Sequence, residues 1–235
     1  MSSHLVVFVK APVPGTVKTR LTLRYTPQQA ADIYRAFVQD VLLQAQRIPV
    51  DLRVLAYSPP GERDRLAEPA PEGWVMTPQA DTDLGGRMAS AAAERFNAGA
   101  ERVVIIGTDA PTLPDEYLTR AFDLLQSNDI VVGPSTDGGY YLVGLASPIS
   151  EIFRDIDWSS ERVLGQTVDR VRAAGLTLGL LPPWYDVDTP DELEFLRAHL
   201  DAALHAGHPF RLPNTFKALQ EHPSPVAQPL SPHKS

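Results

Sequence analysis

The chain contains no cysteine, which excludes disulfide bonds, thiolate metal sites and a cysteine nucleophile. This composition fits a reducing cytoplasm, where we expect the protein to act. The sequence lacks any run of about 20 apolar residues, so it predicts no membrane-spanning helix. Its first apolar run, Leu5–Val9, is shorter than a signal peptide needs and leads directly to Lys10.

Basic charge is also scarce. The chain has 21 Lys and Arg against 29 Asp and Glu, a net charge of −8, and no extended basic stripe, so we expect no nucleic-acid partner. The sequence contains neither a GxxxxGK[ST] phosphate loop nor a GxGxxG fingerprint, which argues against a kinase-type site and a dinucleotide dehydrogenase. Five of the six histidines fall at or beyond position 199 without metal-ligand spacing, so a histidine-based triad is not expected.

What is present is an alternation of apolar strand patterns and amphipathic helix patterns. The strands are expected at 5–9, 52–57, 74–76, 102–107, 129–133, 140–145 and 176–181, and the helices at 27–42, 84–96, 114–126, 159–174 and 190–206. This order predicts an α/β fold of three layers, α/β/α, with a mostly parallel sheet. The neighbouring strands 129–133 and 140–145 interrupt the alternation and indicate a mixed sheet.

The periodicity ends near residue 206. We therefore expect one domain over 1–206, followed by a C-terminal extension over 207–235. The extension is rich in proline towards its end and is expected to be disordered from about residue 223.

A basic loop follows the first strand. Lys10, Lys18 and Arg20 lie on or beside it, and Pro12 and Gly15 break regular structure there. Ligands of open α/β sheets bind outside the carboxyl ends of the strands, so this loop is placed to hold an anion, most simply a nucleotide phosphate. The alternative is a solvated loop that happens to be basic.

The strand 102–107 leads into Gly107-Thr108-Asp109-Ala110-Pro111. A carboxylate at this position, Asp109, could hold a divalent cation against ligand phosphates, as magnesium binding requires. The alternative is that Asp109 only shapes the turn before Pro111.

Two further acids, Asp186 and Asp188, follow the last predicted strand. Thr189 and Glu192 form a capping-box pattern for the next helix, which leaves the two aspartates unexplained. We expect only one of them, Asp188, to face a site, on the assumption that they point to opposite sides. Both could instead be solvated loop acids.

The segment Asp137-Gly138-Gly139 separates the two neighbouring strands. Asp-Gly between apolar runs predicts a hairpin turn. Asp137 could also accept a hydrogen bond from an acceptor substrate, so the turn is expected to line a pocket as well.

Two more segments precede helices. Gly85 could let a base or sugar pack on the backbone and Arg87 could contact phosphate, although a plain helix entry also explains them. Trp158 and Ser159 could line an acceptor site, or Trp158 could be core and a serine could cap the helix.

Together these motifs resemble the nucleotide-diphospho-sugar transferase (glycosyltransferase-A-like) superfamily. Within it, the chain is similar to the bacterial radical-SAM/selenodomain-associated transferase family. The resemblance extends over about residues 5 to 205 and rests on the basic loop, Gly107–Pro111, Pro134–Gly144, Trp158-Ser159 and Asp186–Leu193. The spacing of the lysines and the arginine in the loop also resembles that of 2-phospho-lactate guanylyltransferases.

The resemblance implies roles for these residues. Lys10, Lys18 and Arg20 would hold a triphosphate, with Lys18, Arg20 and Asp109 catalytic. Asp109 and Asp188 would hold Mg²⁺ or Mn²⁺. Pro12, Gly15, Gly85, Arg87 and Thr108 would contact the nucleotide, and Asp137, Gly138, Gly139, Trp158 and Ser159 the acceptor.

Two departures from the superfamily stand out. The basic loop carries a single glycine, Gly15, where sugar-nucleotide pyrophosphorylases carry Gly-x-Gly-x-Arg. Position 107 is glycine, so the Asp-x-Asp of many glycosyltransferases is missing at Asp109.

The expected function is a magnesium-dependent nucleotidyltransferase that joins an NTP to a phosphorylated or carboxylate-bearing small molecule and releases pyrophosphate. One alternative is a glycosyltransferase with a nucleotide-sugar donor, and a second is a nucleotide-binding protein without catalysis. A homodimer is compatible with the sequence, although no feature requires it.

Overall fold

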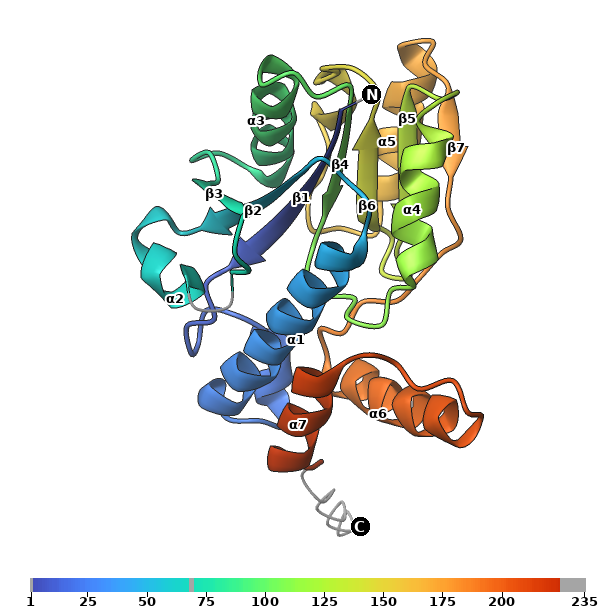
Figure 1. Cartoon of the computed structure of the whole chain (residues 1–235). Helices are drawn as coiled ribbons and strands as arrows, with labels where there is room; N and C mark the ends of the chain where they lie inside the picture. The colour runs from blue at the N-terminus through green and yellow to red at the C-terminus, as the bar shows by residue number, and fades with distance from the viewer. Residues whose placement is uncertain (1, 68–69, 225–235) are drawn as a thin grey trace, which may run out of the picture.

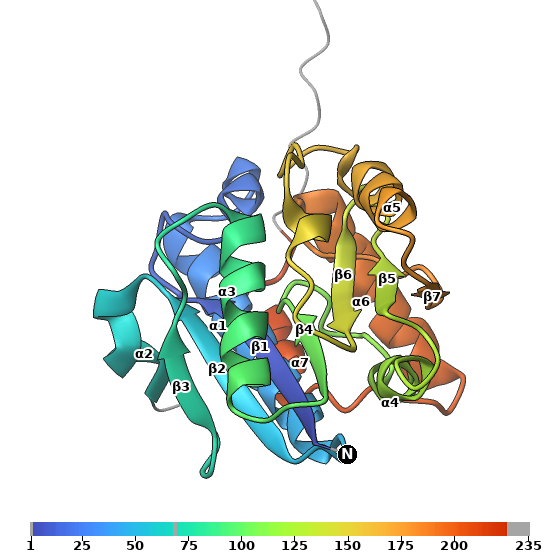
Figure 2. The ribbon, with the colours of Figure 1, turned by 90° about the horizontal axis from the view of Figure 1, so that it is seen from above.

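One mixed sheet forms the centre of the protein. In the computed structural model, which describes residues 2–67 and 70–224, seven strands lie in the order β3-β2-β1-β4-β6-β5-β7 (Figures 1 and 2). They are β1 Ser3–Lys10, β2 Leu52–Ser58, β3 Val75–Pro78, β4 Arg102–Ile106, β5 Ile130–Pro134, β6 Tyr140–Leu145 and β7 Leu178–Leu180. Only β6 is antiparallel to its neighbours, β4 and β5. The expected mixed sheet is confirmed.

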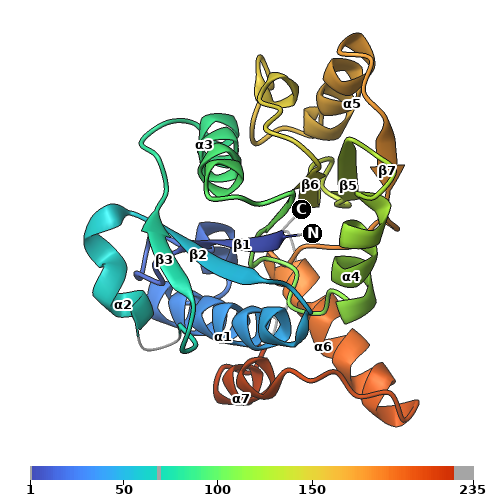
Figure 3. The same cartoon turned by 45° about the horizontal axis from the view of Figure 1, so that its top comes forward.

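Helices cover both faces of the sheet, as Figure 3 shows, and confirm the three-layer α/β/α fold: α3 and α5 lie on one side, and α1, α4, α6 and α7 on the other. The helices are α1 Pro27–Arg47, α2 Arg63–Ala67, α3 Leu84–Asn97, α4 Asp115–Leu124, α5 Val163–Ala173, α6 Pro190–His205 and α7 Pro213–Glu221. In the described part of the chain, no helix combines the length and apolarity needed to cross a bilayer.

The strand β1 is buried on both faces. Leu5, Val7 and Val9 pack on the α1 side, whereas Val6 packs on the α3 side, and each is at most 1% exposed. Each such side chain stabilises the fold by about 1.5–3 kcal/mol. The continuous apolar run in the sequence therefore reflects a sheet that helices cover on both faces.

The helix α1 begins as the sequence predicts. Thr26 accepts a hydrogen bond from Gln29 N while the Gln29 side chain accepts from Thr26 N, with Pro27 at the first helical position. Its Tyr34 and Val38 pack towards the sheet, and its Phe37 packs towards α6. This helix is consequently fixed from both sides.

The helix α5 begins four residues later than expected. Ser159 lies in the left-handed region at φ 68°, and the Ser160 hydroxyl donates to Asp157 O over 2.7 Å. The N-cap residue is Arg162, which makes no side-chain capping bond. Neither serine caps the helix, because both belong to the turn before it.

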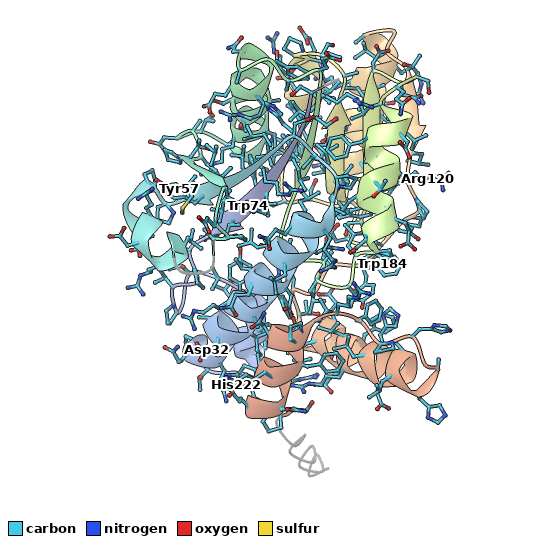
Figure 4. All side chains as sticks on the ribbon, viewed as in Figure 1. Asp32, Tyr57, Trp74, Arg120, Trp184 and His222 are labelled. Atoms are coloured by element: carbon cyan, nitrogen blue, oxygen red, sulfur yellow. The ribbon has the colours of Figure 1, made fainter. Side chains whose placement is uncertain are left out.

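The helix α7 lies in the extension where no helix was expected. The Asp40 carboxylate, buried within α1, accepts hydrogen bonds from Asn214 N, Asn214 Nδ2 and Thr215 N and so caps α7. At the far end, His222 Nε2 lies 3.6 Å from Asp32 Oδ2 (Figure 4). The expected disorder from about 223 concerns mainly residues 225–235, which lie outside the described residues.

Candidate functional site

The carboxyl ends of β1 and β4 are joined by one tyrosine of α1. Lys10 N donates to Tyr34 OH over 3.1 Å, and Tyr34 OH lies 2.9 Å from Thr108 Oγ1. Thr108 is 2% exposed. The loops that follow the two strands, which carry Lys18 and Asp109, are thereby held close together.

Lys18, Asp109 and Asp188 meet at this edge of the sheet. Lys18 Nζ donates to Asp109 Oδ1 and, over 2.7 Å, to Asp188 Oδ1. A backbone bond from Val187 N to Asp109 O, 2.9 Å long, brings the two acidic segments side by side. The convergence that the site hypothesis requires is therefore present.

The Lys18 ammonium is enclosed. Its side chain is 2% exposed, whereas the side chains of Asp109 and Asp188 are 47% and 37% exposed. Burial alone would lower the pKa of Lys18, but the charges of Asp109 and Asp188 hold this pKa above its ordinary value. Nζ also lies 5.6 Å from the Tyr34 ring centre. The group is therefore a buried ammonium whose charge the two carboxylates stabilise.

A cavity of about 320 Å³, the central cleft, lies over the ends of β1, β2 and β4 and the start of β6. Four of the expected site residues line it: Lys10, Arg87, Thr108 and Asp109. The apolar part of the lining includes Phe8, Leu84 and Met88. This mixture suits a ligand with one apolar, planar part and one anionic part.

Arg87 is anchored at one end of the central cleft. Its Nε donates to Thr82 O over 2.8 Å and its Nη1 lies 3.5 Å from Gln79 Oε1, while Gln79 Nε2 donates to Ala56 O over 2.9 Å. Gln79 follows β3, and Asp109 follows β4 three strands away, so these ends are about 14 Å apart at the usual strand spacing. Gln79 was not among the expected residues, because its only signal in the sequence is its place after a strand.

A second cavity, the acidic pocket, has a volume of about 460 Å³ and adjoins the cleft, since Leu84, Asp109 and Tyr140 line both. Its lining contains five carboxylates and one basic side chain, Arg20: the acids are Asp109, Asp137, Glu161, Asp186 and Asp188. Gly139, Trp158 and Ser159 line it as well. Glu161 was missed because its only sequence signal is its proximity to Trp158.

Asp186 faces the acidic pocket together with Asp188, which corrects the expectation that only one of them does. Residues i and i+2 of an extended segment share one face, and Val187 between them points into the core at 0% exposure. The Ser135 hydroxyl donates to Asp186 Oδ2. Burial, aided by Asp109 and the other nearby acids, raises the pKa of Asp186 to about 7.

Four other expected contact residues, Pro12, Gly15, Gly85 and Gly138, line neither the central cleft nor the acidic pocket. Pro12 is buried and Gly15, at φ 79°, is exposed. A Cβ on Gly85 would lie 2.6 Å from Trp158 Cζ2, so this glycine lets α3 pack on the tryptophan. Gly138, at φ 92°, likewise lets the turn before β6 lie directly against the backbone of Glu161.

Asp137 belongs both to the expected hairpin turn and to the lining of a pocket. Its Oδ1 accepts a hydrogen bond from Gly139 N over 2.9 Å, which stabilises the turn, and its side chain lines the acidic pocket. The hairpin and the pocket wall are therefore the same segment.

Aromatic side chains fix the segment that carries Asp186 and Asp188. The Trp184 ring lies between α4 and α6 (Figure 4), with its centre 5.6 Å from that of Tyr117 and 6.3 Å from that of His199. The Tyr185 hydroxyl lies 2.8 Å from both Thr112 Oγ1 and His199 Nδ1. These contacts hold the segment that carries Asp186 and Asp188 in place.

The carboxylates of Asp109 and Asp188 are oxygen donors of the kind that Mg²⁺ and Mn²⁺ prefer. They are close enough to share one cation, because both contact Lys18 Nζ. Within residues 2–67 and 70–224, no cluster of three or more His, Cys, Asp or Glu side chains has a metal-binding arrangement. A metal here would need ligand phosphate and water to complete its coordination.

The fold is that of the nucleotide-diphospho-sugar transferase superfamily. A protein from Desulfovibrio desulfuricans G20, provisionally described as a nucleotide-diphospho-sugar transferase, is 35% identical with a TM-score of 0.84, and the match covers 94% of this chain and 95% of that one. The chain belongs to the DUF2064 family, described as uncharacterized proteins conserved in bacteria, whose model matches residues 41–160. The expectation of a transferase agrees with this relative.

More distant structures share the fold. CMP:2-keto-3-deoxy-manno-octonic acid synthetase in complex with CTP is 13% identical with a TM-score of 0.55, covering 86% of this chain and 99% of that one. Rv0371c from Mycobacterium tuberculosis H37Rv, in complex with manganese, is 20% identical with a TM-score of 0.52, covering 83% and 98%. No curated protein matches the sequence.

Proposed function

We propose that the protein is a divalent-metal-dependent transferase that binds a nucleotide in the central cleft and transfers its nucleotidyl group to a small acceptor in the acidic pocket. The observation that carries this proposal is the meeting of Lys18, Asp109 and Asp188 where the two cavities adjoin. A cation and two partly exposed carboxylates at such a boundary suit a reacting phosphate.

The length of the cleft supports one orientation of the nucleotide. With the phosphates near Asp109, the base would reach the end formed by Gln79 and Arg87, about 14 Å away by strand spacing. Phe8 and Met88 supply apolar contact for the base and sugar. Lys10, at the end of β1, faces the same cleft and can neutralise phosphate charge.

In nucleotidyl transfer, an acceptor oxygen attacks the α-phosphorus and pyrophosphate leaves. Asp109 and Asp188 would hold the metal ion, which supplies charge neutralisation at the phosphate oxygens when it is bound. The fold relative that binds manganese is consistent with such a requirement. The protein itself contributes position and charge rather than a nucleophile.

The acceptor would bind in the acidic pocket. Arg20, which the resemblance would assign to the triphosphate, is the basic side chain of that lining, so we assign it instead to a phosphate or carboxylate of the acceptor. The surrounding carboxylates of Asp137 and Asp186 can accept hydrogen bonds from hydroxyl groups. The acceptor is therefore expected to carry hydroxyls beside its single anionic group.

A second candidate is glycosyl transfer from a nucleotide sugar. It is favoured by the pairing of Trp158 with carboxylates in the acidic pocket, a lining that suits a sugar ring, and by the description of the 35%-identical relative. In that case the pocket holds the donor's sugar.

Thermal-shift measurements with each NTP and with nucleotide sugars, with and without magnesium, test the binding step, since a ligand that binds only the folded state raises its Tm. Mass spectrometry then separates the two reactions: pyrophosphate release indicates nucleotidyl transfer, and nucleoside diphosphate release indicates glycosyl transfer. Binding without turnover across a broad acceptor screen would favour a non-catalytic nucleotide-binding protein.

A further inference from the structure

Lys18 contacts oxygens through which Asp109 and Asp188 could share a metal ion. Its ammonium contacts one oxygen of Asp109 and lies 2.7 Å from Asp188 Oδ1. A divalent ion held by the same two carboxylates would compete for those oxygens, and two cations this close repel each other strongly. Ammonium and metal therefore exclude each other from this position.

We propose that Lys18 is the resident cation of the metal site: it fills the site in the free protein, and a metal–nucleotide complex displaces its ammonium onto the phosphates. The inference rests on the proposed function and specifies the form of the substrate. The protein binds the metal and the nucleotide as one complex, and it binds free metal poorly.

Accessibility supports this order. The carboxylates are open to solvent, at 47% for Asp109 and 37% for Asp188, while the Lys18 side chain is only 2% exposed. An incoming phosphate therefore meets the carboxylates first and reaches the ammonium only after Lys18 moves. A metal bound to the nucleotide would offset the repulsion between phosphate and carboxylate, so that Lys18 can leave the two aspartates for the phosphates.

The backbone at Lys18 also supports a displaceable side chain. Lys18 has φ 46° and ψ 42°, a left-handed conformation that is unfavourable for a residue with a Cβ. Such strain persists where surrounding contacts hold it, and the two carboxylates are the ion-pair contacts that Lys18 makes here. The preceding residues Pro14, Gly15 and Thr16 are exposed, so the loop has room to change conformation.

The consequence is measurable cooperativity. Free metal has to break two charge-assisted contacts and leaves Lys18 without a partner, whereas the complex offers Lys18 new oxygens. Metal and nucleotide should each raise the affinity of the other by the same factor.

The test measures Mn²⁺ binding by electron paramagnetic resonance without nucleotide. Lys18→Met keeps a similar volume against Tyr34 and Phe37 but removes the charge. We expect Lys18→Met to bind one Mn²⁺ roughly 100-fold more tightly than the wild type, because two contacts of a buried charge no longer compete. Adding Asp109→Asn to Lys18→Met should abolish the increase in Mn²⁺ affinity. Lys217→Met, which changes an exposed lysine, should leave Mn²⁺ affinity as in the wild type.

A second measurement needs no variant: Mn²⁺ binding to the wild type at equal free Mn²⁺, with each of ATP, GTP, CTP and UTP. At least one of these nucleotides should raise the Mn²⁺ affinity of the wild type roughly tenfold. The proposal is overturned if the wild type binds Mn²⁺ as tightly as Lys18→Met does. It is also overturned if nucleotide affinity is the same with and without Mn²⁺. If no nucleotide binds at all, the proposed function is wrong. The Mn²⁺ affinity of Lys18→Met relative to the wild type still decides the role of Lys18.

Discussion

The central cleft and the acidic pocket adjoin at Asp109 but differ in charge and in construction. The cleft carries Lys10 and Arg87 against one carboxylate, and it is built on the ends of strands. The acidic pocket carries five carboxylates against Arg20, and its remaining walls come from the 135–139 turn and the 158–161 segment.

This difference separates what the fold provides from what this chain adds. Strand ends are rigid and positioned by the sheet, so the cleft, which we propose as the nucleotide site, follows from the architecture. Turns and helix starts vary more freely in sequence, so the acceptor half is where the specificity of the protein is expected to lie. The ion-paired group of Lys18, Asp109 and Asp188 marks the boundary between the two halves.

The largest effect is expected at the boundary. Asp109→Asn keeps the size of the side chain but removes the charge that a metal and Lys18 both need, so we expect kcat to fall by about 10³-fold. A steady-state assay of pyrophosphate or nucleoside diphosphate release checks this, with the exposed Asp169→Asn as the matched control. Full activity of Asp109→Asn with magnesium would reject the assignment of the site.

The roles of the central cleft and the acidic pocket can be tested separately, because each cavity has an arginine in its lining. Arg87→Met should weaken nucleotide binding about 10-fold or more, because a charge-assisted contact contributes roughly 1.5–3 kcal/mol. Arg20→Met should leave nucleotide affinity nearly unchanged and raise the KM for the acceptor. Isothermal titration with the nucleotide and a KM measurement check both. Equal loss of nucleotide affinity in the two variants would mean that the cavities hold one ligand.

The packing that supports the acidic pocket can be weakened directly. Gly85→Ala places a Cβ 2.6 Å from Trp158 Cζ2 and 2.7 Å from Phe153 O, which should lower the free energy of unfolding by about 2 kcal/mol. Urea denaturation measures this loss. Gly165→Ala in α5 has open space and should be neutral or slightly stabilising. Equal stability of the two variants would contradict the close contact.

The smallest effect concerns the electrostatics of the acidic pocket. Because burial raises the pKa of Asp186 to about 7, the folded state binds this proton more tightly than the unfolded state. The stability that this group provides is complete below its unfolded pKa near 4 and is lost as the pH rises through about 7.

Asp186→Asn stays neutral, so its stability relative to the wild type should rise by about 1 kcal/mol between pH 4.5 and pH 5.5. Urea denaturation at both pH values, without divalent metal, checks the direction. A difference that stays constant with pH would mean that Asp186 is ionised throughout.

The order of strands and helices was predictable to a large extent, because it depends on local patterns. The apolar run of β4, the capping box of α1 and the Asp-Gly turn before β6 each specify their element within a few residues. The helix α7 was not predictable, since its cap is Asp40, a carboxylate 174 positions away from Asn214.

The positions of the candidate site residues were predictable as a set of residue types at strand ends. Lys10, Thr108, Asp109 and Asp188 lie where that reasoning places them, because the carboxyl ends of parallel strands share one edge. The second acid, Asp186, was assigned to the wrong face, although the period of an extended chain places it beside Asp188.

The sequence by itself determined the elements of this protein and the acids and bases at their ends, because both follow from neighbours along the chain. The tertiary structure decided the partners of these groups. Lys18 meets Asp109 across 91 positions and Asp188 across 170, and only the closed sheet brings such distant charges into contact. Burial in that contact makes Lys18 an enclosed, ion-paired cation rather than a solvated loop lysine.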